Sequence, residues 1–190
     1  MEKIQVKILR HGEFKWLKKN HCRAWCTTTL IIANRVKIIV DPGNFSDAVK
    51  IKKLLAKNKL TPADINYVVN SHAHADHIGA NFLFTKAVIV TSDALQKKDE
   101  FVFYDNTKPY TLVPGVKIIA TPGHSAECCT VLAETEKGIV AVAGDLFWLD
   151  EEAEYRWAEY PNKLKANRQL VLKMANYIIP GHGRLLHVKK

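Results

Sequence analysis

The sequence predicts a protein of mixed strands and helices, of the α/β or α+β class, and three observations carry this prediction. First, short runs of β-branched and other apolar residues recur along the chain and end at Gly, Pro or Asp. Second, two segments, near residues 48–55 and 162–175, space their apolar residues as an amphipathic helix does. Third, several runs end directly before His or Asp, which is how α/β folds gather functional side chains at one edge of a sheet.

The first part of the chain is expected to hold three strands, over residues 6–9, 28–33 and 36–40. Asn34-Arg35 is a plausible turn between the second and the third, and Asp41-Pro42-Gly43 ends the third. Residues 14–25 form a basic, aromatic loop between the first two strands. Such a loop can stack on nucleobases or pack on the body as a lid, so we assign it no single role.

A helix is expected next, capped by Ser46-Asp47, with Ala48, Ile51, Leu54 and Leu55 on its apolar face. Thr61 and Pro62 are the cap and the first residue of a short helical turn. The elements predicted after it are, in order, a strand over 65–70, a helix over 78–83, a strand over 87–90 and a helical turn over 92–96.

The last part of the chain is expected to alternate strands with one long helix. The predicted elements are a strand over 116–120, a hairpin of 129–133 with 138–143, a helix over 162–175 and a strand over 177–179. On that helix Leu164, Leu170, Val171 and Met174 are expected to point inward.

The most informative stretch is Ser71-His72-Ala73-His74-Ala75-Asp76-His77, which follows the predicted strand over 65–70. In an extended segment residues two apart point the same way, so His72 and His74 can serve one metal ion, whereas the adjacent Asp76 and His77 diverge. Burying these polar groups without a cation would be unfavourable. The stretch therefore predicts two metal ions side by side, with zinc as the first candidate and iron or manganese as alternatives.

Metal-binding residue types also follow other predicted strands. Five strands end at such a residue, and these ends are Asp41, His72, His124, Asp145 and His182. In four of them Gly stands next to that residue or one position away, which allows a sharp turn and a close approach of the backbone. We therefore expect these ends to meet in one site.

Length and composition are those of an ordinary globular protein. With 190 residues, 47% of them apolar and 25% charged, the chain is expected to be a single domain over 1–190. It shows no signal-peptide pattern and no apolar stretch of membrane-spanning length, so we expect a cytoplasmic protein without a membrane partner. The cysteines lack Cys-x-x-Cys spacing and are expected to be reduced and structural; they are Cys22, Cys26, Cys128 and Cys129.

Charge is distributed unevenly along the chain, whose formal net charge is +9. Residues 1–60 carry a net charge of +10, residues 61–150 carry −5 and residues 151–190 carry +4. Basic ends around a cation-binding centre favour an anionic substrate, nucleic acid included. Lysine used only for solubility explains the same distribution equally well.

Five ordered motifs resemble those of the metallo-β-lactamase superfamily. They are Val40-Asp41-Pro42-Gly43, His72-Ala73-His74-Ala75-Asp76-His77, Thr121-Pro122-Gly123-His124-Ser125, Gly144-Asp145 and Pro180-Gly181-His182-Gly183. The resemblance implies an α+β fold, a four-layer αββα sandwich in which two mixed sheets lie face to face with helices outside. It also implies a dinuclear metal site at one edge of the sandwich.

The resemblance also implies a role for each site residue. It places His72, His74 and His124 on the first metal and Asp76, His77 and His182 on the second, with Asp145 bridging the two. Asp41 would orient a ligand histidine, and Asp76 would orient the nucleophile. Two bound cations would supply hydroxide at neutral pH, which makes the chain a metal-dependent hydrolase.

Within the superfamily the chain is similar to the small branch typified by metallo-β-lactamase domain-containing protein 1. The similarity lies in Val142-Ala143-Gly144-Asp145-Leu146-Phe147, Asn167-Arg168 and Tyr177-Ile178-Ile179-Pro180-Gly181-His182-Gly183. That branch is associated with RNA cleavage, so the favoured substrate is a phosphodiester of RNA or single-stranded nucleic acid.

Several alternatives stay open at this point. The same motifs occur in hydrolases of a small ester, thioester, lactone or β-lactam, such as β-lactamases and glyoxalase II, and in iron persulfide dioxygenases. Trp148 and residues 14–25 are expected to shape the pocket that decides among these substrates. A non-catalytic nucleic-acid-binding protein with a structural metal is disfavoured, because structural zinc sites are closed and usually contain cysteine.

Overall fold

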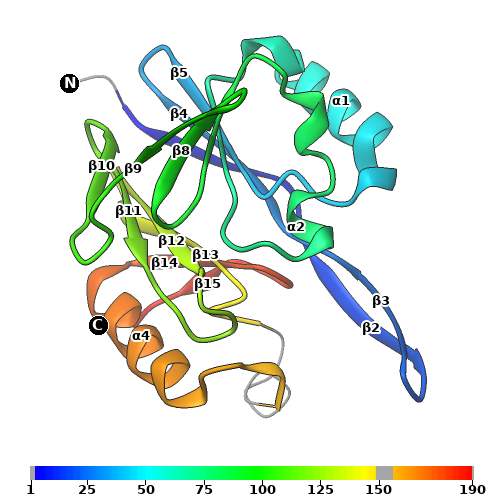
Figure 1. Ribbon diagram of the computed structural model, residues 1–190, viewed down its shortest axis with the longest axis vertical. Helices are drawn as coiled ribbons and strands as arrows, with labels where there is room; N and C mark the ends of the chain where they lie inside the picture. The colour runs from blue at the N-terminus through cyan, green and yellow to red at the C-terminus, as the bar shows by residue number, and fades with distance from the viewer. Residues whose placement is uncertain (1–2, 149–155, 190) are drawn as a thin grey trace.

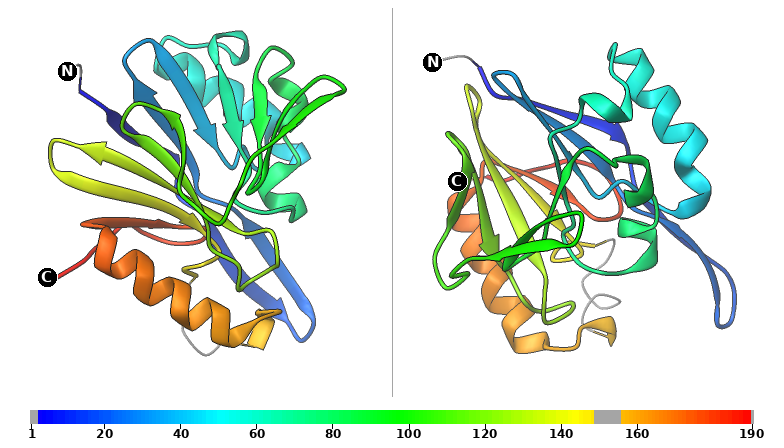
Figure 2. Two further views of the ribbon diagram at one scale, coloured as in Figure 1. Left: turned by 60° about the vertical axis from the view of Figure 1, so that its left-hand side comes forward. Right: turned by 45° about the horizontal axis from the view of Figure 1, so that its top comes forward.

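Two β-sheets lie face to face, and a helix covers the outer face of each (Figures 1 and 2). The computed structural model describes residues 3–148 and 156–189. The four layers run from helix α1 through the first sheet and the second sheet to helix α4, which is the αββα order that the motifs imply.

The first sheet has seven strands in the order β1-β4-β5-β6-β7-β8-β9. Their bounds are β1 Gln5–Arg10, β4 Thr28–Ala33, β5 Val36–Val40, β6 Tyr67–Val69, β7 Val88–Val90, β8 Ala94–Lys97 and β9 Glu100–Phe103. The neighbours β5, β6 and β7 are parallel, while the other neighbouring pairs are antiparallel. The sheet is therefore mixed, and the chain leaves β5 and β6 at the same edge.

The second sheet has six strands in the order β10-β11-β12-β13-β14-β15. Their bounds are β10 Tyr110–Val113, β11 Val116–Ala120, β12 Cys129–Thr135, β13 Gly138–Gly144, β14 Tyr177–Pro180 and β15 Leu186–His187. All neighbouring pairs are antiparallel except β13 and β14, which run parallel. Helix α4, Pro161–Met174, makes the crossover between these two parallel strands.

Alternating side chains divide the apolar core into three parts. On β5, Ile38 and Val40 point between the sheets, whereas Ile39 packs against α1 (Ala48–Lys57) with Ile51 and Leu55. The second sheet follows the same rule and turns alternate residues toward Leu164 and Val171 of α4. Strands that are buried on both faces must be apolar throughout, which explains the runs in the sequence.

Most of the predicted elements are confirmed with shifted ends. The strands at the start of the chain, the hairpin near residue 135 and both long helices form. The expected cap of the first helix is different, because Ser46 and Asp47 lie in a 3₁₀ turn, Phe45–Asp47, and the Asp47 side chain makes no cap hydrogen bond to α1. The turn at Thr61 is a 3₁₀ helix, Pro62–Asp64, with the expected cap. On helix α4 the expected inward position of Leu170 is wrong, because this residue is 45% exposed. Arg168, two residues earlier, is buried instead.

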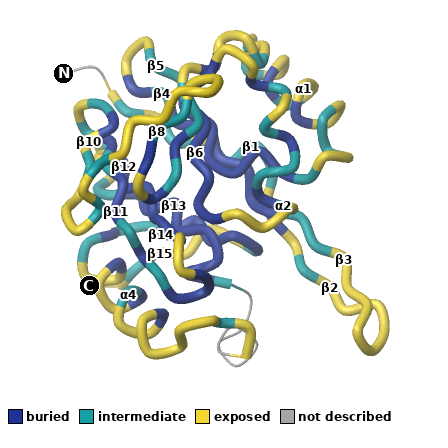
Figure 3. Tube along the Cα trace, in the orientation of Figure 1, coloured by how far each residue is buried: buried dark blue, intermediate teal, exposed yellow. Residues whose placement is uncertain are grey.

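The predicted loop over residues 14–25 is wrong, because these residues form a hairpin of β2, Glu13–Lys18, and β3, His21–Trp25. The hairpin projects from the body of the molecule, and its outer end is exposed (Figures 1 and 3). Asn20 has a φ of 58° at the turn, a conformation that Asn tolerates better than most residues. Phe14 and Trp16 lie on one face and Lys15 on the other, so the segment carries the two-residue period of a strand.

Two predicted helical segments also differ. Residues 92–96 contribute to β8, which pairs with β9 around a turn at Lys98, where φ is 58°. The expected helix over 78–83 is replaced by α2, Ala75–Ile78, and a separate 3₁₀ turn, Asn81–Leu83. The helix gives way at Gly79, where a Cβ atom would lie 2.5 Å from the backbone nitrogen of Phe45. In the part of the chain that the structure describes, no helix has the length and apolarity needed to cross a membrane.

Candidate metal centre

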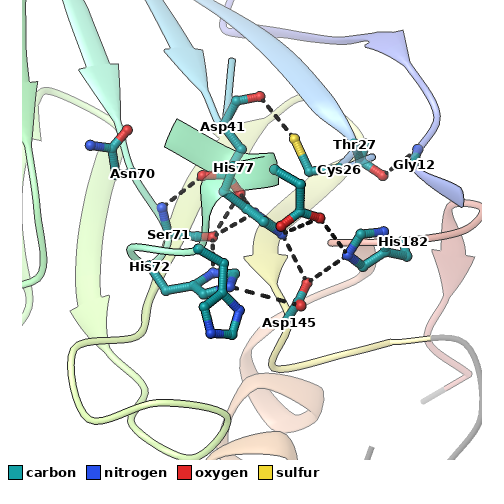
Figure 4. Close-up of polar contacts among 12 residues, drawn as sticks. Gly12, Cys26, Thr27, Asp41, Asn70, Ser71, His72, His77, Asp145 and His182 are labelled. Carbon is teal, nitrogen blue, oxygen red and sulfur yellow. Dashed lines mark hydrogen bonds and ion pairs between the residues drawn. The ribbon is translucent and has the colours of Figure 1, made fainter. Parts of the chain in front are cut away.

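The ends of five strands meet at one edge of the sandwich. Asp41 follows β5 and His72 follows β6 in the first sheet, while His124, Asp145 and His182 follow or end strands of the second. All five side chains are at least nine-tenths buried. The structure thus brings together the side chains that the sequence places at separate strand ends, and Figure 4 shows Asp41, His72, Asp145 and His182 among them.

The candidate ligands form two groups. The atoms of each group that can bind a metal lie within 4.8 Å of one another, and the groups are His72, His74, His124 and Asp145 on one side and Asp76, His77 and His182 on the other. The first group contains His72 and His74, the pair expected from an extended segment, and the second contains the adjacent Asp76 and His77. This division agrees with the one that the family resemblance implies, except that Asp145, a bridging residue in that interpretation, falls in the first group.

Asp145 belongs to the first group and also faces the second (Figure 4). Its Oδ2 atom is 3.8 Å from His72 Nε2 and 3.5 Å from His124 Nε2. Its Oδ1 atom is 3.3 Å from His77 Nε2 and 3.5 Å from His182 Nε2. One carboxylate oxygen therefore faces each group, which is the geometry that a bridging ligand requires.

Asp41 holds the loop that follows β6. Its carboxylate accepts hydrogen bonds from the Ser71 amide at 2.7 Å, the Ser71 hydroxyl at 2.6 Å and His77 Nδ1 at 2.8 Å. Because Nδ1 of His77 donates to this carboxylate, Nε2 is free of its proton when the ring is neutral and faces Asp145. Asp41 itself has a φ of 53°, which places a non-glycine residue in the left-handed region at the site.

His182 is held in a similar way by backbone carbonyls. Its Nδ1 atom lies 3.0 Å from the Trp25 oxygen and 3.3 Å from the Glu13 oxygen, so Nδ1 carries the hydrogen and Nε2 faces the cluster. Both carbonyls belong to the β2–β3 hairpin. Gly181 beside it allows close packing, because a Cβ atom there would lie 1.9 Å from Asp145 Oδ1.

The donor set fits divalent cations. Among the described residues, His72 Nε2, His77 Nε2 and Asp145 Oδ1 are buried without a hydrogen-bond partner. Buried polar atoms without partners are costly, and here they converge on the same space. A cation in each group would satisfy them, and a set of imidazole and carboxylate ligands suits zinc, iron or manganese.

The electrostatics of the cluster are those of a site that binds cations. Burial, and then the neighbouring His77, lower the pKa of His72 well below its usual value, which keeps this imidazole in the neutral, metal-binding form. Burial also acts to lower the pKa of His77, but the carboxylates of Asp145 and Asp41 outweigh it and raise that pKa. Burial raises the pKa of Asp145, and His77 with His182 outweighs it and lowers that pKa well below its usual value. The raised pKa of His77 favours its protonated form in the absence of cations, so binding of a cation by this residue would release a proton.

A cavity of about 330 Å³ opens over the candidate ligands. Its walls are largely aromatic, and the residues that form them besides the ligands are Phe14, Trp16, Cys22, Ala24, Trp148 and Trp157. The ring centroids of Phe14 and Trp148 are 4.7 Å apart, and those of Trp16 and Trp157 are 6.3 Å apart. A larger cavity of about 540 Å³ lies at the β1 edge, far from this chemistry, and none of the candidate ligands lines it.

Sequence reasoning missed two contributors to this site, the Ser71 hydroxyl and the backbone carbonyls around His182. Ser71 received no role, although its hydroxyl lies 3.1 Å from His72 Nδ1 and bonds Asp41. The carbonyls that hold His182 have no sequence signature, because every residue has one. The expectation that Trp148 and residues 14–25 shape the pocket is confirmed by the lining of the cavity, but the hairpin that places Phe14 and Trp16 there was not predicted, although residues 13–18 alternate as a strand does.

The chain belongs to the metallo-β-lactamase superfamily, a superfamily of metal-dependent hydrolases. The model of that superfamily matches residues 26–113. Metallo-β-lactamase domain-containing protein 1 of Xenopus laevis is 33% identical over 193 aligned residues, which cover 97% of this chain and 82% of the frog protein. The human protein of the same name is 34% identical over 158 residues, covering 80% of this chain and 59% of its own length.

Other relatives differ in length and name. The mouse protein of the same name is matched over 63% of its length, so this chain spans less than two thirds of several curated relatives. An N-acyl homoserine lactonase of Bacillus cereus is 30% identical over 154 residues, covering 70% of this chain and 62% of the lactonase.

Solved structures share the fold. A Thermotoga maritima protein described as a metallo-β-lactamase superimposes with a TM-score of 0.73 at 21% identity, over 98% of this chain and 100% of that one. The AiiA protein of B. thuringiensis, solved with N-decanoyl-L-homoserine at its active site, gives a TM-score of 0.68 at 20% identity, over 95% and 93% of the two chains. The αββα architecture is therefore that of metallo-β-lactamase structures.

Proposed function

We propose that the protein hydrolyses an ester-type bond, in an ester, thioester or lactone, of a small substrate that carries an apolar acyl group. The observation that carries this proposal is the uncharged, aromatic wall over the candidate metal centre. The cavity is of the size that holds a small molecule, and its described lining residues include no Lys or Arg. An acyl chain can bury its methylene groups against these rings.

The ligand roles belong to the same proposal. His72, His74 and His124 would hold one divalent cation, Asp76, His77 and His182 the other, and Asp145 both, with zinc as the first choice. When bound, the two cations would polarise the substrate carbonyl and lower the pKa of a water molecule to supply hydroxide.

The chain's own residues perform the remaining tasks. Asp76 has a side chain that is 22% exposed and lines the cavity, so its carboxylate can orient the attacking water and accept its proton. Asp41 keeps the His77 ring in place from behind. Phe14 and Trp16 exclude water from the acyl side of the cavity and position the substrate.

Relatives support this choice of substrate class. The Bacillus cereus relative is named an N-acyl homoserine lactonase, and one structural neighbour was solved with its product N-hexanoyl-L-homoserine at the catalytic metal centre. The first name describes a substrate in which an N-acyl chain stands beside a lactone, and the second describes an N-acyl product without the lactone ring.

The second candidate is a phosphodiester of RNA or single-stranded DNA. The net charge of +9 favours a polyanion, and the exposed Trp16 could stack on a base. Lys15 and Arg23, however, are neighbours on adjacent strands of the hairpin. They lie on the opposite face from Phe14 and Trp16. Backbone phosphates at the metal centre would therefore meet aromatic rings before they met these charges.

Parallel assays of purified protein loaded with zinc, manganese or iron separate the two candidates. The substrates are N-decanoyl homoserine lactone, nitrophenyl esters from acetate to decanoate, an acyl thioester and a labelled single-stranded RNA. We expect ester-type hydrolysis that increases with acyl length and is lost with a chelator and in Asp145→Asn. RNA cleavage with the same two sensitivities, and no ester hydrolysis, would overturn the leading proposal in favour of the second. Consumption of oxygen with a persulfide by the iron-loaded protein would instead identify a dioxygenase.

A further inference from the structure

Helix α4 contacts two loops that carry candidate ligands. Asn167 Nδ2 donates a hydrogen bond to the Pro122 carbonyl at 2.7 Å, two residues before His124. Arg168 Nε donates to the Leu146 carbonyl at 2.6 Å, one residue after Asp145. Two adjacent residues of one helix thus bind the loops of two members of the same candidate metal group.

The start of the same helix holds the His124 loop through the backbone. The Tyr160 amide donates to the Gly123 carbonyl at 2.9 Å, and the Glu159 amide donates to the His124 carbonyl at 3.1 Å. Gly123 allows this contact, because a Cβ atom there would lie 2.5 Å from the Leu164 Cα atom. The His124 loop therefore rests directly on the helix backbone, and Asn167 adds a side-chain contact one turn further along.

Arg168 is an unusual residue for the position it occupies. It is only 9% exposed and lies on the face of α4 that also buries Leu164 and Val171, where an apolar side chain would pack without a charge. Its guanidinium group lies over the Phe147 ring, 5.4 Å from the centroid, and so contacts the Asp145 loop twice. A guanidinium group is costly to bury unless its hydrogen bonds are made, so its contacts with this loop are strong constraints on the loop's position.

We propose that Asn167 and Arg168 are positioning residues that fix the separation of His124 from Asp145 and thereby set metal affinity, Asn167 at the first metal position and Arg168, through Asp145, at both. In the structure His124 Nε2 and Asp145 Oδ2 are 3.5 Å apart. A ligand pair whose separation is fixed before the metal arrives loses little freedom on binding it. This inference rests on the metal centre of the proposed function and adds a role for α4, which contributes no candidate ligand.

Asn167 and Arg168 should differ in which metal positions they affect. Asn167 acts on the His124 loop alone, and His124 belongs only to the first group. Arg168 acts on the Asp145 loop, and Asp145 faces both groups. Loss of the Asn167 contact should therefore weaken one metal position, whereas loss of the Arg168 contact should weaken both.

The test measures metal binding rather than turnover. Wild type and variants are stripped of metal, checked for folding by circular dichroism and thermal melting, and titrated with Co²⁺ against a competing chelator while the visible spectrum is recorded. The variants are Asn167→Ala, Asn167→Asp, Arg168→Lys and Arg168→Met. Asn167→Asp keeps the size of the side chain but cannot donate to the carbonyl, and Gln169→Ala, at an exposed position of the same helix, is the matched control.

We expect two Co²⁺ equivalents in wild type and Gln169→Ala. Both Asn167 variants should bind one equivalent roughly tenfold more weakly, the effect typical of residues behind metal ligands, with the other unchanged. Arg168→Met should weaken both equivalents, and Arg168→Lys, which keeps a charged donor, should lose less. Asn167 variants that fold and bind both equivalents as wild type does, even with a lower melting temperature, would overturn the proposal. A wild type that binds no Co²⁺ would overturn the metal centre itself, so the two failures are distinguishable.

Discussion

Asp41 is a buried residue with a left-handed backbone conformation and a fully hydrogen-bonded carboxylate. It is 1% exposed, adopts a left-handed backbone conformation and accepts three hydrogen bonds from Ser71 and His77. A carboxylate is needed there because all three partners are donors, and its charge also favours a cation on the far side of the His77 ring. The strain of the backbone is compensated by these contacts.

Replacing Asp41 with Asn should therefore weaken metal binding without removing a ligand. The amide keeps one acceptor atom and turns its NH2 group toward a donor, so it loses the bond from the Ser71 amide in one orientation, or the bonds from the Ser71 hydroxyl and His77 Nδ1 in the other. We expect a fall in affinity at the second metal position on the order of 10–100-fold, which metal analysis after dialysis against a graded chelator would measure. Unchanged affinity at both positions would show that Asp41 serves only the fold of its loop.

The cysteines lead to a second prediction at this scale. Burial raises the pKa of the Cys128 thiol to about 12, and burial also raises the pKa values of Cys26 and Cys129 well above the usual value. Thiolate is the reactive form, and at pH 8 only about one Cys128 thiol in ten thousand would be ionised. Cys22, by contrast, is exposed.

Iodoacetamide at pH 8 should consequently modify Cys22 alone in the folded protein and all four cysteines in guanidinium chloride. Intact-mass measurement with peptide mapping would count the modified positions over time. Rapid labelling of Cys128 in the folded state would contradict both the burial and the raised pKa.

The β2–β3 hairpin is the element that joins the fold to the choice of substrate. Its inner face supplies Phe14 and Trp16 to the cavity, and the backbone at both of its ends holds His182. The hairpin thus contributes both to the metal centre and to the aromatic wall of the cavity, which would contact the acyl chain of the substrate. Changes at its side chains should separate these two contributions, because the carbonyls that hold His182 remain in place.

Phe14→Ala and Trp16→Ala should each reduce kcat/KM for a decanoyl ester by about tenfold, through loss of apolar contact with several methylene groups. The acetyl ester, which does not reach the wall, should be hydrolysed as in wild type. Leu17→Ala is the matched control, since Leu17 lies on the same hairpin but does not line the cavity. An equal loss on both esters would mean that these rings support the metal centre rather than the acyl chain.

Elements also differ in how well they could be predicted from the sequence. Strands buried on both faces, such as β5 and β13, have unbroken apolar runs and were predictable. The edge strand β9 was not, because its exposed Phe101, Val102 and Phe103 follow no burial pattern. The candidate ligands were predictable because they cluster at strand ends, whereas the contacts of Ser71 and the carbonyls around His182 depend on packing between distant segments.

At the scale of the whole molecule, the candidate metal centre joins the two sheets. Two of the five strand ends belong to the first sheet and three to the second, and all five side chains are buried. Three apolar clusters hold the layers together independently of any metal. The metal-free protein should therefore fold. Where the two sheets meet, however, its clustered carboxylates and imidazoles would lack the cations that balance them.

Metal removal should lower the free energy of unfolding by an amount that grows with the logarithm of the ratio of free metal to its dissociation constant. A ligand that binds only the folded state at about a thousand times its dissociation constant adds roughly 4 kcal/mol to the free energy of unfolding, which corresponds to about 10 °C in melting temperature for a chain of this size. Thermal melts of stripped and zinc-loaded protein would measure this shift, and the melting temperature should rise further as free zinc increases. Asp145→Asn should abolish most of the shift, because Asp145 faces both groups. A melting temperature that zinc leaves unchanged would mean that the two sheets are held by their apolar clusters alone and that the cluster at their edge does not bind zinc.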